Sequence, residues 1–324
     1  MSTKTTTIKK KIDTRDFLTF FGFVTPGLLI YLFIIVYPVL YSIYLSFSDY
    51  NPNIGSGHLV GLENYIKVLT MNRGVIDPSN NTPEFWHAFK NNMLVVLVSV
   101  FGQIPIGFAL AFILYRKQVK ASRFFQGMVF LPNFLSTIVI GIMWRMLFSV
   151  DGPVARIMQA VSGNPSAQFS LMYDPHKAMI PIAIVLIWMY TGFYMIIFLA
   201  NLQKINESMF EAAKIDGATE FQMFYKITIP LMAAPILTSC ILAIAGSLKG
   251  FALIFALATE GKQRMNTEVL PIFMYNQVFG MAGLGNPKRY AYGAAISNII
   301  VLISVLLIMF SNWVGKQLGT DEEY

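Results

Sequence analysis

Charged residues are scarce in this sequence, and it contains a single cysteine. Asp, Glu, Lys and Arg make up 13% of its 324 residues, whereas hydrophobic residues make up 55%. In soluble globular domains about a quarter of the residues are charged, so this composition excludes an ordinary water-soluble protein. The lone Cys240 excludes an intramolecular disulfide framework.

Motifs of nucleotide-binding, metal and catalytic sites are also missing. The sequence has no G-x-x-x-x-G-K-[ST] pattern, so it lacks the P-loop that holds ATP phosphates. The three histidines, His58, His87 and His176, are scattered and lack the spacing of metal ligands. No nucleophile and base stand in a recognisable arrangement. We therefore expect that the chain is not an enzyme and that it holds no metal and no cofactor of its own.

The sequence does contain six long apolar segments, each near or above the ~20 residues that a membrane-spanning helix needs. They cover residues 17–47, 88–115, 124–148, 179–202, 235–259 and 291–315. None of them contains Asp or Glu. The sequence therefore predicts an all-α integral membrane protein with about six transmembrane helices. Pro26 and Pro38 predict that the first helix is tilted or kinked.

The basic residues indicate how these helices are oriented. The net charge of +7 is not gathered in one stripe with aromatic residues, so it does not indicate nucleic-acid binding. Lys and Arg are denser in residues 1–16, 116–123, 203–234 and 316–324 than in the intervening loops 48–87, 149–178 and 260–290. Because basic residues favour the cytoplasmic side, we expect both termini inside, with tails at 1–16 and 316–324 around a transmembrane domain at 17–315.

Residues 207–235 form a polar stretch between two apolar segments, called here the polar loop. Ser208–Glu211 and Thr219–Gln222 each have the spacing of a capping box at the start of a helix. Asp216-Gly217 between them is a turn signal, because glycine adopts positive φ without steric cost. The pattern predicts a short helix, a sharp turn and a second helix. The simplest alternative is an ordinary connection between two membrane helices.

The polar loop contains Glu211-Ala212-Ala213, then Asp216-Gly217-Ala218, and then Phe224, Ile227 and Pro230. In order and spacing it resembles the EAA loop of permease subunits in binding-protein-dependent ABC importers. Ile229 stands where that family has leucine. The resemblance implies that the loop couples the chain to an ATPase subunit through Glu211, Ala212, Ala213, Asp216, Gly217, Ala218 and Pro230.

Other stretches extend the resemblance over nearly the whole chain from about residue 17. Gly61–Tyr65, Phe130-Leu131-Pro132 with Trp144, and Glu268–Pro271 with Tyr275 are similar to signatures of the sugar-type permeases. Within that group the chain is similar to the larger of the two paired permeases. The cytoplasmic EAA loop of the family also agrees with the orientation indicated by the basic residues.

The resemblance implies a permease subunit of an ATP-driven importer in the bacterial cytoplasmic (inner) membrane. Such a subunit passes a carbohydrate, here an oligosaccharide, from an extracytoplasmic binding protein into the cytoplasm. Its implied partners are a second homologous permease and two ATPase subunits that bind ATP-Mg. An ion-coupled secondary transporter is the alternative, but proton relays usually use carboxylates inside the membrane, and the six segments have none. A membrane enzyme would need a catalytic cluster that is not visible.

The resemblance also suggests residues along the solute path. Trp188 lies where the family places a side chain that faces the solute, and Tyr190, Phe193 and Tyr194 follow it. Aromatic rings suit sugars because the C–H faces of a sugar are apolar. Asn133 and Ser136 in the third segment are weaker candidates, since small polar residues also hold helices together. An aromatic belt or helix packing is the alternative for each aromatic residue.

Two groups of basic residues stand apart from the topology pattern. Lys249 lies near the middle of the fifth segment, where a buried ammonium is costly, and we expect it to face the solute cavity and a solute with an anionic group, such as a uronate oligosaccharide. Water or a carboxylate of the partner permease is the alternative.

The 260–290 loop carries Lys262, Arg264, Lys288 and Arg289 on the expected outer side. We expect this loop to contact the binding protein; a solvated loop is the alternative.

Overall fold

The computed structural model of the chain describes residues 14–50, 55–71, 83–116, 120–164, 171–174, 176–258, 265–280 and 289–317. Nearly all of these residues are helical, and β structure among them is limited to an isolated bridge between Ser48 and Leu59. The predicted all-α fold is confirmed. Most of the predicted tails, residues 1–13 and 318–324, lie outside the described residues.

Among the described residues, four helices are long and apolar enough to cross a membrane: Thr19–Ser46, Glu84–Tyr115, Met179–Leu202 and Tyr290–Gln317. The first consists of α1 (Thr14–Tyr31), a π turn (Leu32–Val36) and α2 (Tyr37–Ser46), and the second of α4 (Glu84–Val98), a π turn (Ser99–Gln103) and α5 (Ile104–Tyr115). The other two are α9 and α17. The predicted Met179–Leu202 segment therefore has the bounds expected from the sequence.

Two further candidate spans are bent, which brings the total to six if each bent pair is one span. In the third segment, α6 (Ser122–Phe130) and the 3₁₀ turn Leu131–Phe134 meet α7 (Thr137–Leu147) at 96°. Pro132 lies in the 3₁₀ turn just before this bend, and because it has no backbone N–H it cannot continue the hydrogen bonding of α6. In the other pair, the end of the polar loop meets α13 (Ala233–Lys249) at 62°.

The predicted fifth segment, 235–259, is not one helix. α13 ends at Lys249, Gly250 is extended with a ψ of 104°, and the short helix α14 (Ala252–Leu257) follows. Glycine loses more backbone freedom in a helix than any other residue, which favours a break at Gly250. Lys249 therefore lies at the C-terminal end of a helix, directly before a break in the segment, and not inside one continuous helix.

The second span begins at Glu84, four positions before the expected residue 88. Glu84 lies in the first turn of α4 and is buried. A carboxylate is favourable there because the N-terminus of a helix carries a partial positive charge. The six segments drawn from the sequence contain no acidic residue, but the helix that forms in this region does.

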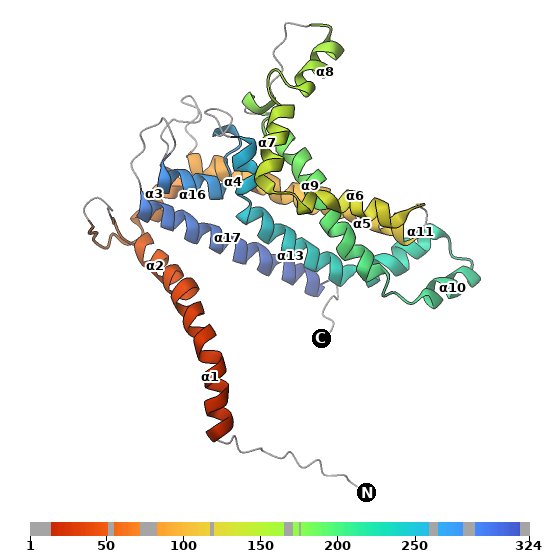
Figure 1. Ribbon diagram of the computed structural model, residues 1–324, viewed down its shortest axis with the longest axis horizontal. Coiled ribbons are helices and arrows are strands. Elements are labelled where there is room, and N and C mark those ends of the chain that lie inside the picture. Colours follow the sequence, from red (N-terminus) through yellow and green to blue (C-terminus); the bar gives the residue numbers. More distant parts are fainter. Residues whose placement is uncertain are drawn as a thin grey trace.

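The spanning helices α4–α5, α9, α13 and α17 pack into one bundle, from which α1 departs (Figure 1). Close approach within the bundle depends on glycine: a Cβ on Gly107 would lie 2.9 Å from Cβ of Tyr194, and one on Gly192 would lie 2.2 Å from the carbonyl oxygen of Val129. By contrast, none of the apolar window of the first helix is buried. Its side chains need lipid or another protein to cover them.

The two ends of the bundle carry different elements (Figure 1). The polar loop, with α10 (Glu207–Ile215) and α11 (Glu220–Met223), lies at one end. The opposite end carries α3 (Glu63–Thr70), α16 (Leu270–Phe279) and the first turns of α4 and α17. The amphipathic helix α8 (Pro153–Ser162) projects away from the bundle. Any communication between the polar loop and α16 must therefore cross the length of the bundle.

Candidate functional site

The polar loop folds as the predicted helix, turn and helix, and its two caps differ. The capping box of α11 is present: the N–H of Gln222 donates to Oγ1 of Thr219 at 3.2 Å, and the N–H of Thr219 donates to Oε1 of Gln222 at 2.8 Å. The predicted box at Ser208–Glu211 is wrong. Asn206 caps α10 instead, because its Oδ1 accepts from the N–H of Ser208 at 3.1 Å.

Gly217 makes the turn between the two helices. Its φ of +77° lies in the left-handed region, and Asp216 ends α10 just before it. Ala218 donates its backbone N–H to the carbonyl oxygen of Ala213, five residues earlier, at 2.9 Å. This is the 6→1 hydrogen bond of a Schellman C-cap. A Cβ on Gly217 would meet no atom of this chain within 4 Å. Gly217 is therefore required by its backbone conformation, and the space around it is open.

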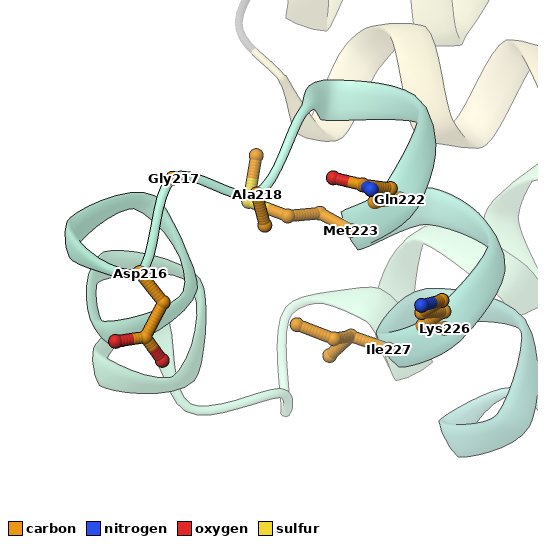
Figure 2. Close-up of a pocket in the computed structure, with 7 residues that line it drawn as sticks. All are labelled: Asp216, Gly217, Ala218, Gln222, Met223, Lys226 and Ile227. Carbon is orange, nitrogen blue, oxygen red and sulfur yellow. The ribbon is translucent and has the colours of Figure 1, made fainter.

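A shallow hollow lies beside this turn, with a volume of about 370 Å³. Figure 2 shows Met223 and Ile227 reaching from the second half of the loop toward the turn. The lining residues are Asp216, Gly217, Ala218, Gln222, Met223, Lys226 and Ile227. Four of them, Asp216, Gly217, Ala218 and Ile227, belong to the pattern that the sequence singled out.

Apolar side chains on the loop are exposed to a degree that sequence reasoning missed. Ile215 is 87% exposed, Phe221 74% and Tyr225 64%. The rings of Phe221 and Tyr225 stack with centroids 6.2 Å apart. Glu211 and Ala212 of the EAA pattern are also exposed. Phe221 and Tyr225 have i, i+4 spacing within a polar loop, and this spacing was the sequence signal that could have indicated the exposed surface. Exposed apolar patches with a polar surround are typical of protein contact sites.

The opposite side of the polar loop is fixed to the end of the second span. The ring of Phe224 lies 4.8 Å from that of Phe112 and 6.0 Å from that of Phe108, between centroids. The ring of Phe210, which is buried, lies 6.2 Å from that of Tyr115. In addition, the Arg116 guanidinium forms an ion pair with the Glu220 carboxylate. The loop is thus held against α5 while its other face stays open.

Pro230 lies just before the bend that leads into α13. A π turn (Phe224–Thr228) and the single turn α12 (Ile229–Leu231) precede Met232, where the chain turns into α13. Pro230 takes an early position of α12, where the missing N–H is not needed, and its side chain is exposed. Its predicted role in coupling stays a prediction.

The residues expected along the solute path differ in exposure on α9. Trp188 is 40% exposed and its ring meets that of Trp144 edge to face, with centroids 5.5 Å apart. Phe193 is 37% exposed, and Tyr190 is half-buried. Tyr194 is 5% exposed and packs in the core against Gly107. In this structure the Tyr194 side chain packs inside the bundle, whereas the side chains of Trp188 and Phe193 are partly exposed.

The polar candidates lie at breaks in the helices. Asn133 Nδ2 donates to the carbonyl oxygen of Met189 at 2.8 Å, which joins the 3₁₀ turn of the third segment to α9. Ser136 precedes α7 and is exposed, without a side-chain cap bond. Lys249 is exposed at the end of α13, and no described acidic residue forms an ion pair with it. A cation at a helix C-terminus is stabilised by the helix dipole, which lowers the cost of placing it there.

A cluster of aromatic rings that begins two residues after Lys249 was not anticipated. It consists of Phe251 and Phe255, just before and on α14, and of Tyr275 and Phe279 on α16. The ring of Tyr275 lies 5.2 Å from that of Phe251, 5.4 Å from that of Phe255 and 4.8 Å from that of Phe279, and Phe251 and Phe255 lie 4.8 Å apart, between centroids. Phe279 at its end is 60% exposed. Both pairs have i, i+4 spacing, but the sequence alone could not bring them together, because the break at Gly250 sets the direction of α14.

Residues 103–319 match the family described as the binding-protein-dependent transport system inner membrane component. The chain belongs to this family. A probable ABC transporter permease protein of Pyrococcus horikoshii is 31% identical to this permease over 89% of the chain and 92% of the relative. The lactose transport system permease protein LacF of Rhizobium radiobacter is 29% identical, over 98% and 99% of the two chains.

One further relative and one solved structure are similar over most of the permease. The polygalacturonan/rhamnogalacturonan transport system permease protein YteP of Bacillus subtilis is 24% identical over 93% of this chain and 88% of its own. A chain of a bacterial alginate ABC transporter, solved with its pentasaccharide-bound periplasmic protein, superposes with a TM-score of 0.75. It is 21% identical, covers 94% of this chain and 96% of its own, and shows that the fold is shared.

The family assignment confirms the resemblance that the polar loop indicated. The permease is a multi-pass membrane protein of an ABC importer, and this decides against the alternative of an ion-coupled secondary transporter. Members of the family are permease subunits, which are not enzymes themselves. Within the part of the chain that the structure describes, no three His, Cys, Asp or Glu residues are placed to hold a metal ion.

The basic loop at 260–290 is described only in part. Lys262, Arg264 and Lys288 lie outside the described residues. Arg289 is described, and its side chain contacts its own chain: Nη1 lies 3.4 Å from the sulfur of Met71, and the guanidinium lies 6.0 Å from the ring centroid of Tyr292. The contact of this loop with a binding protein stays a prediction.

Proposed function

We propose that this permease passes an oligosaccharide with acidic groups from an extracytoplasmic binding protein into the cytoplasm. In this proposal both termini lie in the cytoplasm, and so does the polar loop. The permease pairs with a second, homologous permease in the bacterial cytoplasmic membrane. Two ATPase subunits bind ATP-Mg, and one of them docks on the polar loop.

The observation that carries the coupling part of the proposal is the open face of the polar loop. Gly217 has free space around it, and the hollow beside it is lined by residues of the EAA pattern. Ile215, Phe221 and Tyr225 add exposed apolar surface that a partner can bury. Glu211 is exposed in the middle of α10 and offers a carboxylate to a basic group of that partner.

The proposed cargo rests on relatives and on one side chain. Two relatives are named as transport proteins for lactose and for polygalacturonan/rhamnogalacturonan, which supports a carbohydrate. Lys249 supports the acidic group, because it is exposed at the end of α13 and has no acidic partner among the described residues. An ammonium that faces a water-filled path attracts a carboxylate of the solute. Trp188 and Phe193 offer aromatic faces for the sugar rings.

The test compares acidic and neutral oligosaccharides of the same length in the assembled importer. Uptake and solute-stimulated ATP hydrolysis are measured for the wild type and for Lys249→Gln. We expect Lys249→Gln to lose transport of the acidic oligosaccharide selectively. If the wild type uses both solutes equally, or if the variant loses both to the same extent, the acidic cargo is wrong, while a neutral carbohydrate remains the cargo that the relatives indicate.

A further inference from the structure

The polar loop is connected along the chain to α9 and α13, but its side chains contact a different helix. Phe224 lies between Phe108 and Phe112, and Phe210 lies beside Tyr115. These three partner rings all belong to α5, the second half of the second span. A force on the loop is therefore transmitted by packing to the second span as well as along the backbone.

An ion pair adds a polar attachment at the same place. Arg116 directly follows the last residue of α5, and Glu220 is the first residue of α11. Each charge is also favourable to its own helix, because a cation suits a helix C-terminus and an anion suits a helix N-terminus. The pair thus joins the end of one helix to the start of the other. The Arg116 side chain is 21% exposed and that of Glu220 is 61% exposed, so Glu220 is the partner whose substitution disturbs packing less.

At the opposite end of the bundle, the second span is attached to the segment that leads into α16. Asn92, which is fully buried, accepts from the N–H of Leu270 through Oδ1 at 3.2 Å. Its Nδ2 donates to the carbonyl oxygen of Ser247 in the last turn of α13 at 3.3 Å. One amide therefore joins α4 both to the start of α16 and to the end of α13.

The neighbouring Asn91 reinforces this attachment. Its Nδ2 donates to the carbonyl oxygens of Asn266 at 3.0 Å and Glu268 at 2.9 Å. Asn276 of α16 in turn donates to Oε1 of Glu268 at 2.6 Å. Buried hydrogen bonds of this kind are costly to leave unmade, so the segment from Met265 to Phe279 stays with the second span when that span moves.

We propose that the second span, Glu84–Tyr115, is the connection through which the polar loop moves the Met265–Phe279 segment at the opposite end of the bundle. Arg116 and Glu220 are positioning residues that fix the loop to this span. The inference rests on the proposed function, in which the loop docks an ATPase subunit. It adds that the movement passes through a helix distant in sequence from the loop.

The experiment uses the complete importer with its partner subunits in liposomes. Cys240→Ser removes the native thiol, and Val161→Cys and Phe279→Cys place spin labels at exposed positions of α8 and α16. Pulsed electron paramagnetic resonance measures the change in distance between the labels when ATP and vanadate are added. Solute transported per ATP hydrolysed is measured on the same proteins. The variants are Arg116→Glu, Glu220→Arg and the charge swap Arg116→Glu/Glu220→Arg.

A matched control is Lys204→Glu, which reverses a charge near the polar loop but whose hydrogen bond goes to Asn201 of α9. Because exposed ion pairs are weak, we expect each single reversal to lower the solute transported per ATP by about two- to fivefold. The change in label distance on addition of ATP and vanadate should decrease in the same variants. The charge swap should restore both this distance change and the solute transported per ATP. Lys204→Glu should alter neither, and the ATPase subunits should co-purify with all variants.

The outcomes separate this inference from the proposed function. If Arg116→Glu behaves like Lys204→Glu while Gly217→Val uncouples hydrolysis from transport, the loop is the dock but the second span is not the connection. If the charge swap fails to restore coupling, the Arg116–Glu220 ion pair does not fix the polar loop to the second span. If substitutions at Gly217 and Glu211 also leave transport intact, the part of the proposed function on which this inference rests, the docking of an ATPase subunit on the polar loop, is wrong.

Discussion

Ala213 and Ala218 are joined by a backbone hydrogen bond of 2.9 Å across the turn that Gly217 makes. The bond closes the turn between the two helices of the polar loop through the backbone alone. At Gly217 the turn presents bare backbone, because a Cβ there would meet nothing within 4 Å beyond its two chain neighbours.

Substitution of Gly217 separates backbone conformation from contact with a partner. A β-branched residue at a φ of +77° is strained by about 1–2 kcal/mol, so Gly217→Val should distort the turn and uncouple ATP hydrolysis from transport. Gly217→Asn tolerates this conformation and should keep the turn. We expect Gly217→Asn to leave the melting temperature of the permease unchanged but to reduce co-purification of the ATPase, because its side chain fills the space of the partner. Full transport by a Gly217→Val/Glu211→Lys double variant would refute the assignment of the loop.

Trp188 should contribute to solute handling. Its ring is 40% exposed, and removal in Trp188→Ala takes away an aromatic face for a sugar ring. Stacking of this kind is worth about 1 kcal/mol, so we expect roughly a fivefold rise in the transport KM and a lower solute-stimulated ATPase rate. Trp313 is a matched control, since it is 57% exposed on α17 and stacks on Phe310. If Trp188→Ala and Trp313→Ala both leave KM unchanged, Trp188 does not line the path.

Gly192 should tolerate no side chain. A Cβ there would lie 2.2 Å from the carbonyl oxygen of Val129, so Gly192→Ala must push α9 away from α6. Overpacking of this kind costs about 1–3 kcal/mol, which thermal unfolding of the detergent-solubilised permease can measure. Gly246→Ala is the control, because no atom lies within 4 Å of the added Cβ and alanine favours the helix. Equal melting temperatures for the two variants would show that the α6–α9 contact adapts without cost.

The apolar segments were predicted well where hydropathy and helix coincide, and poorly where the helix breaks inside apolar sequence. Residues 179–202 form one helix with the expected bounds. Around Pro132 and Gly250 the sequence stays apolar while the backbone turns, so hydropathy gave no sign of either break, and the proline and the glycine were the only local signals. For that reason Lys249 was expected within a span and is found at a helix end.

Within the polar loop, most features set by neighbouring residues could be predicted from the sequence, whereas contacts with distant residues could not. The Thr219–Gln222 box and the turn at Gly217 depend on neighbouring residues, and the sequence predicted both. The predicted cap of α10 was wrong because Asn206 and Ser208 are both good N-cap residues, and the structure uses Asn206. The pair Arg116–Glu220 joins residues 104 positions apart, so no local pattern could indicate it.

The exposed surface of α1 has a consequence for which substitutions the chain tolerates. None of the apolar window of the first span is buried within its own chain, and α2, the second half of this span, packs against α17. The close contacts of Gly107 and Gly192 lie elsewhere in the bundle and do not involve α1. An exchange of one apolar residue of α1 for another therefore alters the boundary with lipid or with another subunit and leaves the interior of the bundle unchanged.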